Sequence, residues 1–167
     1  AMNWRLSKLD KIALISNSDS HSPSRIGREA NVLDTKLSYN GIMEAIKERN
    51  LADGEPNKFL YTIEFFPEEG RYHYDGHRNC GVCLAPEESK KHNNICPKCG
   101  RLLTLGVVYR VDELADRAFG EKPPSAPPFK NLIPLDQIIG DALGIGVKSN
   151  GVEKEYIQLI AVFANEL

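Results

Sequence analysis

The chain has 167 residues, which is enough for one ordinary domain or two small ones, and it is 41% hydrophobic and 26% charged. Its formal net charge of -2 supplies no overall basic field, which argues against nonspecific binding to nucleic acid or to an anionic membrane. No apolar run approaches the roughly 20 residues that cross a bilayer, and residues 1–10 lack the apolar core of a secretion signal. The sequence therefore predicts a cytoplasmic protein without a membrane partner.

The first predicted element is a short buried strand over residues 12–15, followed by a polar cluster that contains Asp19 and His21. An Asp and a His two residues apart at the carboxyl end of a strand could hold a divalent metal through carboxylate oxygen and imidazole nitrogen. The alternative is that Asp19 forms the turn after the strand and that His21 lies at the surface.

The residues around this strand suggest a ligand site and a covering helix. Trp4 is expected to pack against the core or a ligand. Arg25 and Arg28 could bind phosphate, or they could belong to a solvated loop. Ser38 predicts the N-cap of a helix over residues 39–50. One strand and one helix cannot close a sheet, so this part of the chain is interpreted as a piece of something larger.

The middle of the chain carries a predicted metal site. Residues 58–66 alternate like a strand that ends at Pro67. The four cysteines follow as two Cys-x-x-Cys pairs with a twelve-residue spacer, long enough for a hairpin, and the second pair leads into a predicted strand over residues 102–111. Such pairs are typical of a zinc ribbon, and four thiolates leave no open position, so the zinc would be structural. The ligands are Cys80, Cys83, Cys96 and Cys99.

His77 and Arg78 precede the first cysteine pair. His73 and His77 are a weak alternative metal pair, because Asp75 and Gly76 favour a turn there. His77 and Arg78 are therefore interpreted as a polar surface that could contact the substrate.

The last third of the chain is predicted to be helical. Short helices are expected over residues 112–119, 135–143 and 152–166, with an extended proline-rich loop over residues 121–130 between the first two. A Gly-Ile-Gly turn and Lys148 could contact a nucleic-acid backbone, but the helices could equally form a cap.

Several stretches together resemble the endonuclease Q family, namely NWRLSKLD, ISNSDSHSPSRIGREAN, IEFFPEEGRYHYDGHRNCGVC and CPKCG. The resemblance implies an α+β chain in three parts: the C-terminal piece of a PHP-type (polymerase and histidinol phosphatase) α/β barrel in residues 1–66, the four-cysteine zinc ribbon in residues 67–111, and a small helical domain in residues 112–167. It also implies that Asp19 and His21 are catalytic metal ligands and that Asn17 contacts the damaged base.

The family resemblance implies a DNA-repair endonuclease that cuts 5′ of deaminated bases such as uracil and hypoxanthine. A divalent metal cluster of zinc, manganese or magnesium would activate water there, and an Asn amide could both donate to and accept from a flipped base. DNA with deaminated bases is the expected partner. The other PHP metal motifs are absent, so the missing N-terminal PHP segment is expected in a parent chain, and these 167 residues alone are expected to be inactive.

Two other readings remain open. The chain could be a non-catalytic zinc-ribbon module that binds nucleic acid or protein. PHP chemistry could also act on a small phosphate ester, although such an enzyme would have little use for the ribbon and the helical tail.

Overall fold

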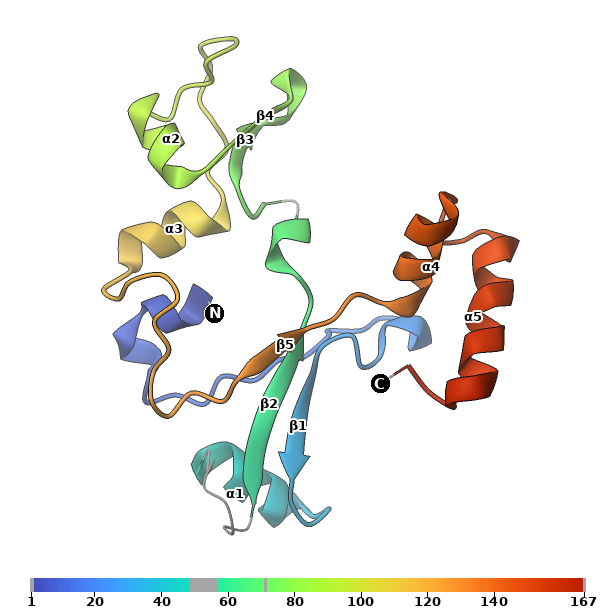
Figure 1. The fold of residues 1–167 in the computed structure, drawn as a ribbon. Coiled ribbons are helices and arrows are strands. Elements are labelled where there is room, and N and C mark those ends of the chain that lie inside the picture. Colours follow the sequence, from blue (N-terminus) through green and yellow to red (C-terminus); the bar gives the residue numbers. More distant parts are fainter. Residues whose placement is uncertain (1, 49–56, 71, 167) are drawn as a thin grey trace. The chain divides into compact units, whose positions relative to one another are not determined.

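The computed structural model describes residues 2–48, 57–70 and 72–166. The chain forms two compact units, Ala1–Lys130 and Asn131–Leu167. Figure 1 shows a mixed α+β chain of small sheets and short helices. None of the helices in the described ranges is both long and apolar enough to cross a membrane.

The main sheet of the first unit has the strand order β1-β2-β5, formed by Ala30–Asp34, Lys58–Glu64 and Phe129–Asn131. β1 runs antiparallel to β2, with a register shift between Val32 and Leu33. The predicted strand over residues 58–66 is confirmed as β2, whose Phe59 and Ile63 are buried. β5 begins at the end of the loop that was predicted for residues 121–130.

Helix α1, Tyr39–Glu48, contacts both β1 and β2. The Ser38 hydroxyl accepts a hydrogen bond from the Gly41 N–H at 3.1 Å, which confirms the predicted N-cap. Gly41 and Ala45 are buried. Residues 49 and 50 of the predicted helix lie outside the described residues.

The predicted strand over residues 12–15 is wrong. The segment is irregular, and Ile12 and Ile15 are 54% and 52% exposed. The Asn31 side chain replaces a neighbouring strand: its Oδ1 accepts from the Ser16 N–H at 2.9 Å, and its Nδ2 donates to the Ser16 carbonyl at 2.8 Å. Because these two hydrogen bonds reach the backbone of Ser16 alone, they do not continue along the segment as the backbone hydrogen bonds of a sheet would.

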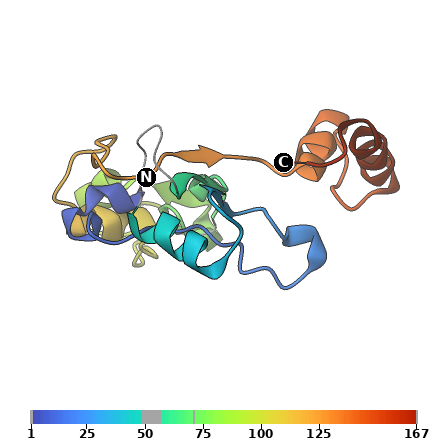
Figure 2. The same cartoon turned by 90° about the horizontal axis from the view of Figure 1, so that it is seen from below.

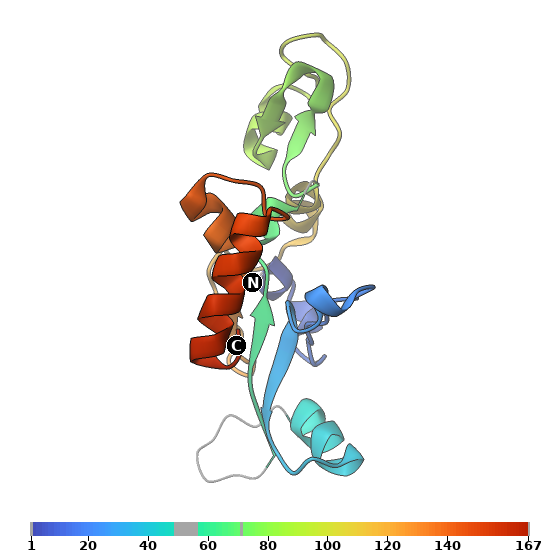
Figure 3. The ribbon, with the colours of Figure 1, turned by 90° about the vertical axis from the view of Figure 1, so that its right-hand side faces the viewer.

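The predicted metal-binding region, residues 72–104, combines a hairpin with one short helix. β3, Asp75–His77, pairs antiparallel with β4, Val82–Leu84, as Figure 3 shows. The 3-10 turn Arg78–Cys80 connects them, and another, Pro67–Glu69, follows β2. The cysteine spacer, which is long enough for a hairpin, contains helix α2, Pro86–Lys91. The N–H of its N-cap residue Ala85 donates to the Glu88 carboxylate at 3.2 Å.

The predicted strand over residues 102–111 is also wrong, because helix α3, Val107–Leu114, occupies its second half. Only the isolated bridges Gly76↔Thr104 and Ile95↔Leu102 remain of it. The helix expected over residues 112–119 is therefore displaced towards the N-terminus, and α3 crosses the proposed domain boundary at residue 111. The three-domain division stays a prediction.

The N-terminal segment lies against α3 and the loop after it. Its first ten residues contain two 3-10 turns, Met2–Arg5 and Ser7–Leu9, and a third 3-10 turn, Pro23–Arg25, lies further along the chain. Arg5 pairs with Asp112 at 3.2 Å, and Arg117 pairs with Asp10 at 2.5 Å. These two ion pairs join sequence positions more than a hundred residues apart.

The second unit contains helices α4, Leu135–Leu143, and α5, Asn150–Phe163, which contact each other and lie side by side in Figure 2. The predicted helix over residues 135–143 is confirmed, and its C-cap Gly144 is left-handed with φ 64°. The helix predicted over residues 152–166 exists but begins earlier, because Ser149 caps it, and ends earlier, at Phe163.

Candidate metal centre and substrate-facing residues

Four side chains of the metal-binding region converge on one point. One ligand atom each from His77, Cys80, Cys96 and Cys99 lies within 4.8 Å of the others. His77 Nδ1 is 3.1 Å from Cys80 Sγ and 3.2 Å from Cys99 Sγ. A tetrahedral zinc site with ordinary bond lengths separates its ligand atoms by roughly 3.5–3.8 Å. The three sulfurs and one imidazole nitrogen therefore fit a metal ion such as zinc.

Two tight turns supply these ligands. His77 ends β3 and Cys80 ends the turn that follows it, while Cys96 and Cys99 belong to a second turn closed by a hydrogen bond from the Gly100 N–H to the Cys96 carbonyl at 2.9 Å. Gly81 and Gly100 follow the two turns with φ of 60° and 73°. Left-handed backbone at both places favours glycine, which has no side chain to strain it.

Among the described residues, the group of four ligand atoms contains His77 and not Cys83, and the role of Cys83 as a fourth thiolate ligand stays a prediction. Cys83 pairs with Gly76 across the β3–β4 hairpin, whereas His77 pairs with Val82. Paired residues of an antiparallel hairpin share a face and successive residues alternate between faces. Cys83 therefore lies on the opposite face from His77, and it is exposed.

Within this cluster, the pKa of Cys80 and the pKa of Cys96 are shifted in opposite directions. The pKa of Cys80 is raised to about 11, first by its hydrogen bond with Cys99. At Cys96 burial raises the pKa, but hydrogen bonds from the Lys98 and Cys99 backbone outweigh it and bring the pKa to about 7. Thiols this close resist ionising together, and a metal ion removes that conflict by taking the place of their protons.

Asp19 and His21 are both exposed. Asp19 has a left-handed backbone with φ 46°, and His21 Nδ1 lies 2.8 Å from the Asp19 carbonyl oxygen. A His that donates Nδ1–H to a carbonyl presents its Nε2 lone pair outwards, as many metal-binding His residues do. In the described ranges, no third His, Cys, Asp or Glu side chain joins these two in a potential metal site.

The predicted base-reading residue, Asn17, is exposed, and its Oδ1 accepts from Asn31 Nδ2 at 3.4 Å. Asn31 thus holds both Ser16 and Asn17. Sequence reasoning missed this role, since a single Asn inside a strand gives no signal of a distant contact.

The other predicted substrate-binding residues are scattered over the first unit. Trp4 packs edge-on against Phe129 with ring centroids 5.2 Å apart. Arg25 and Arg78 are exposed, and Arg28 is half-buried. His77 lies in the cluster with Cys80, Cys96 and Cys99, and its contact with substrate stays a prediction. Its spacing to Cys80, His-x-x-Cys, is the same as that of each cysteine pair and is the signal that could have found it.

No family model matches the chain. It is 34% identical over 162 residues to the uncharacterized protein MJ0043 of Methanocaldococcus jannaschii, covering 96% of this chain and 20% of that protein. It is 28% identical over 141 residues to the uncharacterized protein YqxK of Bacillus subtilis, covering 83% of this chain and 33% of that one. The chain thus spans a third or less of these relatives.

Two solved structures share the fold over almost the whole chain. The lesion-specific endonuclease PfuEndoQ of Pyrococcus furiosus matches 98% of this chain and 40% of its own length, with a TM-score of 0.83 and 31% identity. Endonuclease Q in complex with a 27-mer duplex substrate that carries an abasic lesion at the active site matches 99% of this chain and 41% of its own length, with a TM-score of 0.79 and 31% identity. Over almost its whole length, the chain is therefore similar in sequence and in fold to part of endonuclease Q.

Proposed function

We propose that this chain is the part of a DNA-repair endonuclease that binds lesion-containing DNA and supplies some of its catalytic metal ligands. The observation that carries the proposal is the match over 98–99% of the chain to a lesion-specific endonuclease and to an endonuclease Q bound to damaged DNA. In the parent enzyme the substrate would be DNA with deaminated bases such as uracil and hypoxanthine, cut 5′ of the lesion.

Asp19 and His21 are the proposed catalytic ligands. Their position after an irregular, half-exposed segment supports the view that residues 1–66 complete a PHP-type α/β barrel with a missing N-terminal PHP segment. That segment would supply the remaining ligands for zinc, manganese or magnesium. A lone carboxylate and a lone imidazole cannot hold a multi-metal cluster, so this chain alone would not cut DNA.

The proposed role of the His77 cluster is structural. Four protein ligands leave no open coordination position for water or substrate, and zinc is the ion that sulfur and imidazole ligands in tetrahedral arrangement suit best. The metal would fix the hairpin β3–β4 to the turn that contains Cys96 and Cys99.

The proposal is tested by fluorescence anisotropy with labelled duplexes that differ at one position, carrying uracil, hypoxanthine, an abasic site or a normal base. We expect the chain to bind the lesion duplexes more tightly than the normal duplex, without metal-dependent nicking of any of them. Equal affinity for all four duplexes would contradict lesion recognition by this part of the enzyme, and nicking would contradict its inactivity.

A second test uses the parent enzyme. Asp19→Ala should abolish cleavage and leave binding largely intact if Asp19 is a metal ligand. Unchanged cleavage would favour the alternative function, a non-catalytic zinc-binding module that docks on nucleic acid or protein. The His77 cluster, which is complete in this chain, is the observation that favours the alternative.

A further inference from the structure

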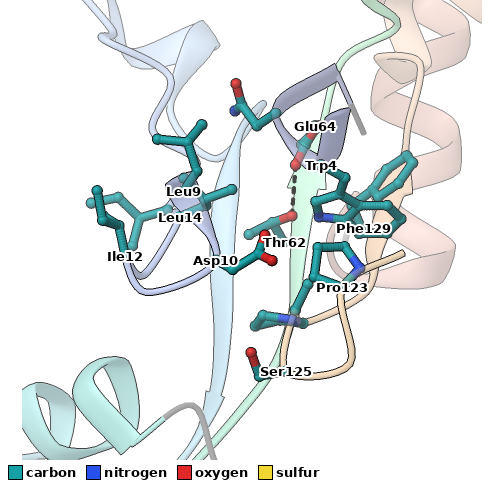
Figure 4. A pocket seen from close by; sticks show the side chains of 14 residues that line it. Trp4, Leu9, Asp10, Ile12, Leu14, Thr62, Glu64, Pro123, Ser125 and Phe129 are labelled. Atoms are coloured by element: carbon teal, nitrogen blue, oxygen red, sulfur yellow. Dashed lines mark hydrogen bonds between the residues drawn. The ribbon is translucent and has the colours of Figure 1, made fainter. Parts of the chain in front are cut away.

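The first unit contains a cavity of about 70 Å³ between the N-terminal segment, β2 and the proline-rich loop that precedes β5. Figure 4 shows Trp4 and Phe129 on one side, Thr62 and Glu64 on the strand between, and Leu14 on the other side. One water molecule needs about 10–15 Å³ of such a cavity, so there is room for on the order of five waters. That is the room needed by one planar heterocycle.

The wall of the cavity is aromatic and borders a cation. The Trp4 and Phe129 rings meet at 68° with centroids 5.2 Å apart, which fixes both rings. Lys122 Nζ lies 5.8 Å from the centre of the Trp4 ring. Aromatic side chains that stack on bases, with lysines beside them for the backbone, are the recurring elements of single-stranded nucleic-acid sites.

The polar part of the cavity accepts hydrogen bonds. Glu64 Oε1 accepts from the Thr62 hydroxyl at 2.8 Å, which uses one of the several acceptor positions of that carboxylate. Burial, and then the negative charge of Glu64, raise the pKa of the neighbouring Glu29. The oxygens of a carboxylate pair with N–H donors, such as the exocyclic amine of cytosine.

We propose that this cavity binds an unpaired, amine-bearing base of a DNA strand, with its ring on the Trp4–Phe129 wall and its amine donating to Glu64. The proposal rests on the proposed function, because it takes the strand from the same damaged DNA. Deamination removes the exocyclic amine, so the base that fits here is an undamaged one. The cavity would hold a displaced base near the lesion. The damaged base itself would be contacted at a different place, by Asn17.

The test uses the intrinsic fluorescence of the chain, since Trp4 is its single tryptophan. Homopolymeric single strands of deoxycytidine and of thymidine are titrated into the whole chain, together with free dCMP. Stacking on Trp4 should quench its emission saturably. The amine contact should make the deoxycytidine strand bind about tenfold more tightly than the thymidine strand, within the range of one good side-chain–base pair.

Glu64→Gln is the discriminating variant, because it keeps the shape and the bond to Thr62 but can both donate and accept. It should bring the two strands to within about twofold of each other. Glu68→Gln, an exposed carboxylate in the turn after β2, is the matched control and should keep the preference. Circular dichroism of both variants checks that they are folded.

The outcomes separate the two proposals. No saturable quenching by either strand, or equal quenching by both in the unaltered chain, overturns the base-binding cavity. Binding of the lesion duplexes without any change in Trp4 emission overturns it too and leaves the proposed function standing. Quenching by dCMP with the expected loss in Glu64→Gln, but no binding of lesion duplexes, would support the cavity as a nucleotide site and overturn the proposed function.

Discussion

At the scale of single residues, the pleat of a three-residue strand decides which side chains meet. His77 and Cys83 both stand three positions from Cys80 along the sequence, so their spacing is identical. The pairing of His77 with Val82 and of Gly76 with Cys83 puts them on opposite faces of the hairpin. Only the face of His77 meets the turn that carries Cys96 and Cys99.

This arrangement predicts how two substitutions at the hairpin differ. His77→Ala removes one of four ligands and should weaken zinc binding by at least about tenfold, whereas Cys83→Ser should leave it unchanged. Competition with a chromogenic chelator at neutral pH measures both affinities. If Cys83→Ser weakened zinc binding as much as His77→Ala, the set of three sulfurs and one imidazole would be wrong.

At the scale of elements, some helices and strands could be predicted from nearby residues, whereas others depended on contacts with distant parts of the chain. Residues 39–48 and 135–143 could be predicted as helices, because Ser38 begins one and Gly144 ends the other within the sequence itself. β2 could be predicted from its alternation and from Pro67. These signals lie within a few residues of the elements they define.

The two wrongly predicted strands depended on distant contacts. The apolar run over residues 102–111 reads equally as strand or helix. Contacts with residues far back in the chain decide for α3: the Gly106 N–H donates to the Asp75 carboxylate at 2.6 Å, and the Val107 N–H to the Tyr72 carbonyl at 2.8 Å. Residues 12–15 have the composition of a strand, but Asn31 takes the place of a pairing strand.

The turn between α4 and α5 offers a prediction with its control in the same turn. Gly144 has φ 64°, so Gly144→Ala should destabilise the α4–α5 pair by about 1 kcal/mol, because an L side chain strains left-handed backbone. Gly146 lacks a left-handed φ and has open space where a Cβ would stand, so Gly146→Ala should be neutral. Hydrogen exchange of the α4 amides measures both, and equal protection in the two variants would contradict the prediction.

The ion pair between Arg5 and Asp112, which attaches the N-terminal segment to α3, should stabilise the chain less at acid pH. Lys90 first, and Arg5 as well, hold the pKa of Asp112 below its ordinary value of 3.8. The pKa of Asp112 is lower in the folded chain than in the unfolded chain. Its contribution to stability is therefore complete at a pH above the pKa in the unfolded chain, and it is lost as the pH falls through the pKa in the folded chain. Asp112→Asn should therefore cost about 1 kcal/mol or less near neutral pH.

The pH dependence is measured as the difference in the free energy of unfolding between the unaltered chain and Asp112→Asn, so that any loss of zinc affects both alike. The difference should be constant near neutral pH and shrink at the acid end of the titration. Glu113→Gln, which breaks the more exposed pair with Arg110 at 2.9 Å, is the matched control and should have a smaller effect. A difference that persisted unchanged in acid would contradict the role of Asp112.

At the scale of the whole molecule, the metal-binding region has little apolar interior of its own. Its regular elements are two three-residue strands and a six-residue helix. Its buried side chains include the polar groups of His73, Asp75 and Ser89 beside Cys96 and Leu103. Small domains with so little core depend on a metal or a disulfide for stability. α4 and α5 belong to the other compact unit and contain no cluster residue.

Removing the metal should therefore unfold one part of the chain and spare another. Hydrogen exchange measured with and without a strong zinc chelator should show lost protection in β3, β4 and α2, because the thiols of Cys80, Cys96 and Cys99 would no longer be held together. α4 and α5 should keep their protection and so serve as the internal control. Restoring zinc should restore the lost protection in the unaltered chain and in Cys83→Ser, but much less in His77→Ala. Unchanged protection of β3 and β4 after chelation would mean that hydrogen bonds alone stabilise the hairpin, and the structural role of the metal would have to be abandoned.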